Sequence, residues 1–244
     1  MTKAYADKVV LVTGANAGIG EAVAVAFQEA GATVFAMARR PDALESARSR
    51  HPGIRWVLGD VAQESQVVSA IEGVVREAGR IDVVVNNAGI FQFAPLEQST
   101  AELVRSQFEV NVFGATFVAR AALPALKASR GSIVNISSAA GHKVVPGGAH
   151  YGATKAALES LTRSWALELA SQGVRVNAIA PGPTTSAGFN AMPAAMQEAF
   201  VKQAPLGRAG STAEVAHWVV AIADPTVTWM TGQVLSIDGG MSLT

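Results

Sequence analysis

The chain has 244 residues, of which 50% are hydrophobic and 16% are charged, and its formal net charge is zero. This length and composition fit one large domain with a substantial core, and the balanced charge gives no sign of a nucleic-acid partner or an anionic membrane surface. The absence of cysteine excludes disulfides and thiolate chemistry. The N-terminus lacks the apolar core of a signal peptide, and no apolar run approaches the ~20 residues of a membrane span. We therefore expect a cytoplasmic protein.

Short apolar strands alternate with helical segments along the chain. The first strand, 9–12, is β-branched and precedes a predicted helix over 21–30. Further strands are predicted at 33–38, 54–58, 81–85, 132–136, 174–179 and 233–237. Further helices are predicted from 42, over 63–78, 99–126 and 212–223, and from about 150 to 171. This alternation is typical of a parallel sheet covered on both faces. We predict an α/β fold: one doubly wound Rossmann domain over 1–244, with a mobile lid at 183–205.

A glycine-rich turn, Thr13–Gly20, joins the first strand to the first helix. Glycines at this place let the backbone approach a pyrophosphate, which the helix N-terminus stabilises. The spacing is G-x-x-x-G-x-G rather than the commoner G-x-G-x-x-G. Its position after the first strand nevertheless predicts a dinucleotide site.

The end of the second strand indicates which dinucleotide binds. An NAD site places an acid there for the ribose hydroxyls, whereas this chain has Ala38 followed by Arg39 and Arg40. Two guanidiniums without an acid favour the 2′-phosphate of NADP(H); the alternative is a pair of solvated arginines. Asp60, at the end of the third strand, is a candidate for the adenine amine or for a helix N-cap.

Tyr151 and Lys155 lie four residues apart on a predicted helix and therefore share one face. An ammonium beside the phenol favours the phenolate and is expected to lower the tyrosine pKa. The pair is a candidate general acid/base, although this spacing alone also occurs by chance on ordinary helix faces.

Together these motifs resemble the classical short-chain dehydrogenase/reductase family over essentially the whole chain. They are the glycine turn at 13–20, Asn86-Asn87-Ala88-Gly89, Asn111, Ser137-Ser138, Tyr151/Lys155, Pro181-Gly182 and Asp238-Gly239-Gly240. The resemblance implies that Ser138, rather than Ser137, binds the substrate carbonyl and that Tyr151 protonates its oxygen. It further implies that Lys155 lowers the tyrosine pKa and binds the nicotinamide ribose, and that Asn111 binds a water in a proton relay.

The resemblance also implies a cofactor set. It comprises Thr13, Gly14, Asn16, Ile19, Gly20, Arg39, Arg40, Asp60, Val61, Asn87, Ala88, Gly89, Tyr151, Lys155, Pro181, Gly182, Thr184 and Ser186. The segment Pro-Gly-Pro-Thr-Thr-Ser departs from members that have Val or Ile fourth and Thr sixth, but Ser186 keeps a hydroxyl.

The substrate pocket is predicted from apolar residues after the fourth and fifth strands and in the lid. The candidates are Phe91, Phe93, Ala140, His142, Val145, Phe189 and Met192, with Gln92, Ala139, Val144, Met196 and Phe200 beside them. His142 could instead be a solvated loop residue, and the lid side chains could serve only for packing. An apolar pocket with few polar anchors suits a neutral, fairly hydrophobic ketone or secondary alcohol.

The first hypothesis is therefore an NADP(H)-dependent carbonyl reductase or alcohol dehydrogenase. A β-ketoacyl-acyl-carrier-protein reductase is the alternative, but Ser129 separates Lys127 from Arg130 and Gln172 stands where such reductases tend to have arginine. A non-catalytic NADP-binding regulator is disfavoured because Ser138, Tyr151 and Lys155 are all present. A sugar-nucleotide epimerase is disfavoured by the small C-terminal region. The resemblance also implies a homotetramer built on two-fold axes, with no nucleic-acid or membrane partner.

Overall fold

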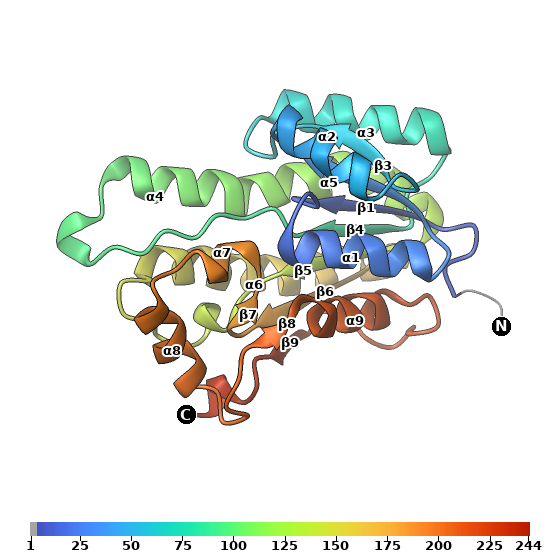
Figure 1. The fold of residues 1–244 in the computed structure, drawn as a ribbon. Coiled ribbons are helices and arrows are strands. Elements are labelled where there is room, and N and C mark those ends of the chain that lie inside the picture. Colours follow the sequence, from blue (N-terminus) through green and yellow to red (C-terminus); the bar gives the residue numbers. More distant parts are fainter. Residues whose placement is uncertain (1–3) are drawn as a thin grey trace.

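The computed structural model describes residues 4–244, which form a seven-stranded parallel sheet flanked by helices (Figure 1). The strand order is β3-β2-β1-β4-β5-β6-β9. The strands are β1 (Val9–Thr13), β2 (Thr33–Ala38), β3 (Arg55–Leu58), β4 (Val83–Asn86), β5 (Ser132–Ile136), β6 (Arg175–Pro181) and β9 (Val234–Ile237). The order reverses between β1 and β4, so the predicted doubly wound Rossmann fold is confirmed.

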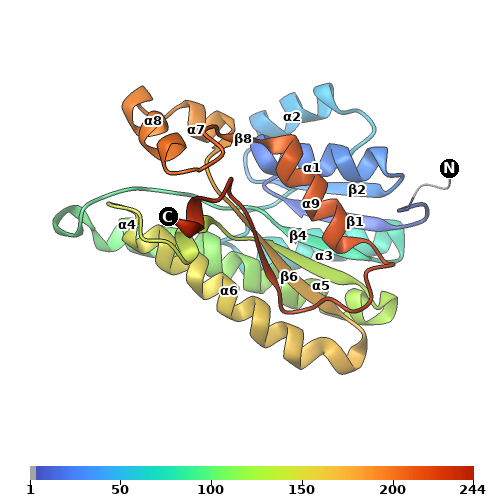
Figure 2. The same cartoon turned by 90° about the horizontal axis from the view of Figure 1, so that it is seen from below.

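Two helical layers cover the sheet, as Figure 2 shows from below. Helices α1 (Gly18–Glu29) and α9 (Thr212–Ala223) enclose one core with the sheet, and α3 (Glu64–Ala78), α5 (Ala115–Ser129) and α6 (Ala149–Leu169) enclose the other. Helix α2 (Pro41–Arg50) lies beside β3. The central strands β1, β4 and β5 are buried along their whole length, as expected of β-branched strands covered on both faces. The edge strand β3 exposes Arg55 and Leu58.

The helix predicted over 99–126 is interrupted in the structure. Thr100 caps α4 (Ala101–Phe108) by accepting a bond from the Leu103 amide at 3.2 Å. A π-helical turn, Glu109–Gly114, then joins α4 to α5. Helix α5 continues to Ser129, where Arg130 adopts a left-handed conformation with φ 51°. The apolar pattern does not reveal this turn, because one extra residue changes the helical phase only locally.

The predicted insertion at 183–205 folds into β7 (Thr184–Thr185), α7 (Ala187–Asn190) and α8 (Ala194–Lys202). Strand β7 pairs in parallel with β8 (Gly210–Ser211). Its mobility remains a prediction. Within residues 4–244, none of the helices is long and apolar enough to cross a membrane.

Candidate active site

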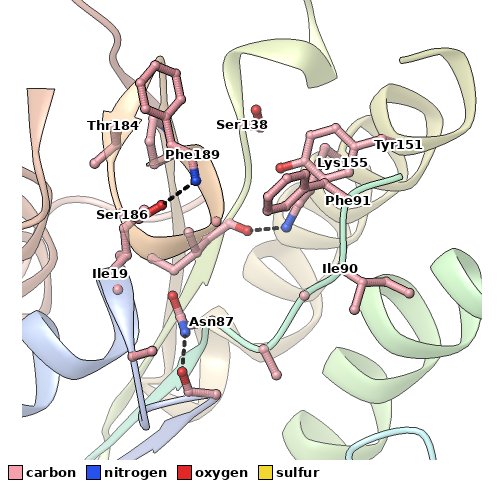
Figure 3. A pocket seen from close by; sticks show the side chains of 18 of the residues that line it. Ile19, Asn87, Ile90, Phe91, Ser138, Tyr151, Lys155, Thr184, Ser186 and Phe189 are labelled. Carbon is pink, nitrogen blue, oxygen red and sulfur yellow. Dashed lines mark hydrogen bonds between the residues drawn. The ribbon is translucent and has the colours of Figure 1, made fainter. Parts of the chain in front are cut away.

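A long cleft opens at the carboxyl ends of the strands, where the strand order reverses. The glycine turn, the ends of β2 and β4 and the segment after β6 line one half of it. The segment after β5 that carries Ser138, helix α6 and the insertion line the other half. Figure 3 shows Ser138, Tyr151 and Lys155 gathered on one side, with Ser186 and Phe189 on another wall. This is the position at which open α/β sheets bind ligands.

Hydrogen bonds join the glycine turn to the residues that directly follow β4. Asn87 Nδ2 donates to the Thr13 carbonyl at 2.9 Å and to the Gly14 carbonyl at 3.1 Å. Thr13 Oγ1 accepts from the Asn87 and Ala88 amides at 3.1 and 3.0 Å. Gly14 has φ +62°, and a Cβ there would lie 2.8 Å from the Ala88 Cα. Thr13 therefore supports the turn from behind, and the backbone stays free to approach a pyrophosphate.

Gly20 plays a similar supporting part, because a Cβ there would lie 2.3 Å from Asn87 Nδ2. Gly20 and Thr13 are thus placed behind the cleft wall rather than on its surface. The remaining predicted cofactor residues of the glycine turn, Gly14, Asn16 and Ile19, do line the cleft.

The two arginines after β2 have different surroundings. Arg39 lines the cleft, and its Nη1 lies 3.9 Å from Asp60 Oδ2. Arg40 is outside the cleft lining and pairs at 3.7 Å with Asp42 in the first turn of α2. The structure does not bring Arg40 to the cleft, because this residue precedes Pro41 and pairs with the start of α2, and its contact with the cofactor remains a prediction. Asp60 lines the cleft and also accepts a bond from the Ala62 amide at 3.0 Å.

Lys155 lies on α6 one turn after Tyr151, as the spacing predicted. Its Nζ donates to the Ile136 carbonyl at 2.7 Å and lies 5.8 Å from the centre of the Tyr151 ring. The residue is 4% exposed. Burial lowers the pKa of Lys155 to about 8, and the charge of Glu159 opposes that decrease.

The pKa of Tyr151 does not follow the sequence expectation. Burial raises the pKa of the Tyr151 phenol, and the Ser138 hydroxyl beside it acts in the opposite direction. The predicted lowering by Lys155 is not the dominant effect, and the ammonium donates to the Ile136 carbonyl at 2.7 Å and lies 5.8 Å from the centre of the ring. Tyr151 is therefore neutral at pH 7 and holds a proton that it can donate.

Asn111 lies in the π-helical turn and is almost fully buried. Its Oδ1 accepts from the Ile90 amide and its Nδ2 donates to the Ile90 carbonyl, both at 2.8 Å, and Nδ2 also donates to Thr154 Oγ1 at 3.0 Å. A Cβ at Gly89 would lie 3.3 Å from Asn111 Oδ1 and 3.5 Å from Lys155 Nζ. Gly89 therefore lies beside both groups, and the water relay through Asn111 remains a prediction.

An aromatic wall adjoins Tyr151. The centres of the Phe91 and Phe93 rings lie 6.2 and 6.1 Å from that of Tyr151, and the Phe200 ring lies 6.0 Å from Phe93. Two glycines make room for this wall. A Cβ at Gly188 would lie 2.8 Å from Phe91, and a Cβ at Gly148 would lie 2.9 Å from Phe93.

A family model described as enoyl-(acyl carrier protein) reductase matches residues 14–242. The chain is a classical short-chain dehydrogenase/reductase. The 3-oxoacyl-[acyl-carrier-protein] reductase of Thermotoga maritima is 38% identical over 96% of this chain and 97% of that protein. The rabbit (Oryctolagus cuniculus) L-fucose dehydrogenase is 37% identical over 98% of this chain and 86% of that protein. Two relatives of nearly equal sequence identity to this chain are therefore named for different substrates.

Two solved members of the family have the same fold. The 3-ketoacyl-(acyl-carrier-protein) reductase from Brucella melitensis, complexed with NADH, has a TM-score of 0.92 and 30% identity, and the match covers 97% of this chain and 99% of that one. The structure named ElxO with NADP bound has a TM-score of 0.91 and 32% identity, with the same two coverages.

Most short-chain dehydrogenase/reductase positions expected from the sequence do line the cleft of this chain. Among the predicted cofactor and catalytic residues these are Val61, Asn87, Ala88, Gly89, Ser138, Tyr151, Lys155, Pro181, Gly182, Thr184 and Ser186, and among the predicted substrate-pocket residues Phe91, Phe93, Ala140, Val145, Phe189, Met192 and Phe200. Val144 and Met196 are outside the lining and are 89% and 38% exposed. Gln92 is also outside the lining and is exposed, and its main chain bonds to the side chain of Gln107.

His142 does not line the cleft, and its place in the substrate pocket remains a prediction. Its Nδ1 lies 3.2 Å from Glu159 Oε1 and its Nε2 lies 3.3 Å from Ser236 Oγ, so the ring is directed away from the cleft. Met241 and Ile90 were missed, although both line the cleft. Each directly follows a recognised motif, Asp238-Gly239-Gly240 and Asn86–Gly89, and this adjacency was the available signal.

Proposed function

We propose that this chain reduces neutral, fairly hydrophobic ketones with NADPH, and that Tyr151 is the general acid. The observation that supports this most is the aromatic wall beside Tyr151, formed by Phe91, Phe93 and Phe200. Among the residues that line the cleft, only Arg39, Asp60 and Lys155 are charged. Arg39 and Asp60 belong to the cofactor half, so the substrate half offers an apolar surface and little to bind a charged substrate.

The glycine turn fits a dinucleotide, since Gly14 lines the cleft with φ +62° and packs so closely on Ala88 that a Cβ would lie 2.8 Å from the Ala88 Cα, which leaves the backbone of the turn facing the cleft. Gly14, Asn16 and Ile19 would hold the phosphates, and Lys155 and Ser186 would lie toward the nicotinamide. When bound, NADPH supplies the hydride. Ser138 donates a hydrogen bond to the carbonyl oxygen and holds it near Tyr151, and the Tyr151 hydroxyl gives its proton to that oxygen. Lys155 stabilises the resulting phenolate, and the space beside Gly89 admits a proton from solvent through Asn111.

The preference for NADP(H) over NAD(H) rests on the end of β2. Ala38 is buried and uncharged, and Arg39 lies at the cleft within reach of a 2′-phosphate. The similar solved structures hold NADH in one case and NADP in the other, so the family alone does not decide the cofactor.

Reduction of a 3-oxoacyl thioester on acyl-carrier protein is the second candidate, because the Thermotoga and Brucella relatives are named for it. The expected docking side of this chain is poorly basic. Gln172 is half-buried and bonds to the Glu168 carbonyl at 3.5 Å, and Ser129 bonds inward to the Ile81 carbonyl at 2.7 Å. Lys127 and Arg130 are the exposed basic residues beside Ser129 that an acidic carrier protein would meet.

NADPH oxidation followed with a panel of aryl ketones, alicyclic ketones, keto acids and acyl-carrier thioesters tests the proposal. We expect the highest kcat/KM for the neutral aryl or alicyclic ketones. A higher kcat/KM for the acyl-carrier thioester would establish the second candidate instead. Tyr151→Phe is the control, because it must abolish turnover of whichever substrate is used.

We also propose that the chain is a cytoplasmic homotetramer. Large apolar side chains are exposed on the two helical stretches, 99–126 and 149–171, that the family resemblance pairs across a two-fold axis: Phe113 before α5 and Leu167 on α6. Sedimentation equilibrium checks the mass, and Leu167→Glu should reduce it.

A further inference from the structure

Glu159 is a buried carboxylate on the same face of α6 as Tyr151 and Lys155. It follows Lys155 by one helical turn and Tyr151 by two, and it is 6% exposed. Burial of a carboxylate is costly unless the group is hydrogen-bonded or paired. The hydride transfer proposed above assigns no role to Glu159, so the burial of this carboxylate needs another reason.

Both side-chain partners of Glu159 belong to one short segment, residues 137–142, which we call the Ser138 turn. Ser137 Oγ donates to Glu159 Oε1 at 2.8 Å, and His142 Nδ1 lies 3.2 Å from the same oxygen. Ser137 directly precedes Ser138, and His142 directly follows the 3-10 turn Ala139–Gly141. One carboxylate oxygen therefore joins both ends of the Ser138 turn to α6.

The Ser138 turn also contacts α6 closely through two glycines. A Cβ at Gly141 would lie 2.7 Å from Glu159 Oε1 and 3.2 Å from the Lys155 carbonyl carbon. A Cβ at Gly152 would lie 2.6 Å from the Ala140 oxygen. Ser138 Oγ accepts a bond from the Ala140 amide at 3.2 Å, so the direction of the serine hydroxyl depends on the shape of this turn.

We propose that Glu159 is a positioning residue, which holds Ser138 and its turn against the helix that bears Tyr151 and Lys155. This inference rests on the proposed function, because it gives Ser138 the task of holding the carbonyl oxygen. A serine hydroxyl displaced by about 1 Å can cost roughly 100-fold in rate, so a rigid attachment at both ends of the turn has a direct catalytic value.

The charge of Glu159 has a second effect, on Lys155. The charged or titratable groups that face Glu159 are Lys155 on its own helix and His142 from the turn. Asp238, after β9, acts on His142 from the other side, where Ser236 Oγ lies 3.3 Å from Nε2. Burial lowers the pKa of Lys155 to about 8, and Glu159 opposes this decrease. Removal of the carboxylate charge should therefore let Lys155 lose its proton at a lower pH.

Glu159→Gln tests the proposal, with Glu168→Gln, an exposed position on the same helix, as the matched control. We expect Glu159→Gln to lower kcat/KM for the ketone by roughly 10- to 100-fold at pH 7 and to move the alkaline decline of kcat/KM to lower pH. Glu159→Asp keeps the charge but shortens the reach, so it should lower kcat/KM while the alkaline decline stays at the wild-type pH. The control should match the wild type in both measurements.

Amide hydrogen exchange gives a readout that does not depend on turnover. The amides of Ala140, Gly141, His142 and Lys143 are bonded within the turn. Glu159→Gln should make the peptide over 137–143 exchange faster without altering β4 or α1. If Glu159→Gln had the same kcat/KM, the same pH profile and the same amide exchange as the wild type, the positioning role would be overturned. A wild-type enzyme that reduces no ketone, combined with faster exchange in the variant, would overturn the proposed function alone.

Discussion

Replacement of Arg39 by isoleucine should remove most of the preference for NADPH over NADH. Arg39 is the one cation of the cofactor half that lines the cleft, whereas its neighbour Arg40 lies outside it with Asp42. Arg40→Ile is therefore a matched control with the same loss of charge, one residue away.

The size of the effect follows from the exposure and the surroundings of Arg39. A charge-assisted hydrogen bond is worth about 1.5–3 kcal/mol, which corresponds to roughly 10- to 100-fold in affinity at about 1.4 kcal/mol per decade. The Arg39 side chain is 60% exposed, and Asp60 Oδ2 at 3.9 Å competes for it. Screening by solvent and the competition from Asp60 favour the lower end of this 10- to 100-fold range, so we expect a preference for NADPH over NADH of about tenfold.

The assay is kcat/KM for both cofactors at low and high salt, with a ketone at saturation. The wild-type preference should decrease as salt rises, because the contact is exposed. Arg39→Ile should lower kcat/KM for NADPH and leave the value for NADH unchanged, and Ala38→Asp with Arg39→Ile should favour NADH. A wild-type enzyme that uses both cofactors equally, or an Arg40→Ile variant that loses as much as Arg39→Ile, would refute the assignment.

Three further expectations concern Tyr151, Lys155 and Gly14. Tyr151→Phe should lower kcat by roughly 10²–10⁴-fold with nearly unchanged NADPH affinity measured by fluorescence titration; residual turnover near the wild-type rate would exclude Tyr151 as the acid. Lys155→Met should abolish turnover yet raise the free energy of unfolding at pH 7 by on the order of 1–2 kcal/mol, since the buried ammonium is costly and the lost bond to Ile136 offsets part of the gain. The pKa of Lys155 is about 8 in the folded chain and 10.5 in the unfolded chain, so between these two pH values the unfolded chain binds more protons. The free energy of unfolding of the wild type therefore rises with pH in this range. Urea denaturation should show that the stability advantage of Lys155→Met shrinks toward pH 10.5. Gly14→Ala should destabilise the fold by about 1–2 kcal/mol or more, because φ is +62° and the new Cβ meets Ala88. The control is Gly73→Ala in α3, where a Cβ meets nothing, and it should instead stabilise the fold by about 0.5–1 kcal/mol. Equal shifts of Tm in the two variants would contradict the strain argument.

The fold was predictable because its strands are short β-branched runs that need cover on both faces, and such runs in alternation with helices permit few arrangements. The positions of Tyr151 and Lys155 followed from helical spacing alone. The direction of the His142 ring did not, since it depends on Glu159, which is 17 residues away in the sequence. The separation of Arg39 from Arg40 likewise depends on where α2 begins. The pKa of Tyr151 could not be inferred from spacing, because burial and the bond from Lys155 to Ile136 are properties of the assembled site.

The π-helical turn at Glu109–Gly114 separates the packing of α5 from the placement of Asn111. A π-helical turn holds one more residue than the α-helical stretch that would take its place, so a deletion of one residue within 109–114 converts the turn to α-helix and leaves α4 and α5 in the same rotational phase. Val118, Ala119, Ala122 and Leu126 would then stay buried against the sheet and α3. The side chains of the turn itself would change direction, and Asn111 would lose its hydrogen bonds to Ile90 beside Lys155. A single-residue deletion here should therefore reduce activity far more than it reduces the stability of the core.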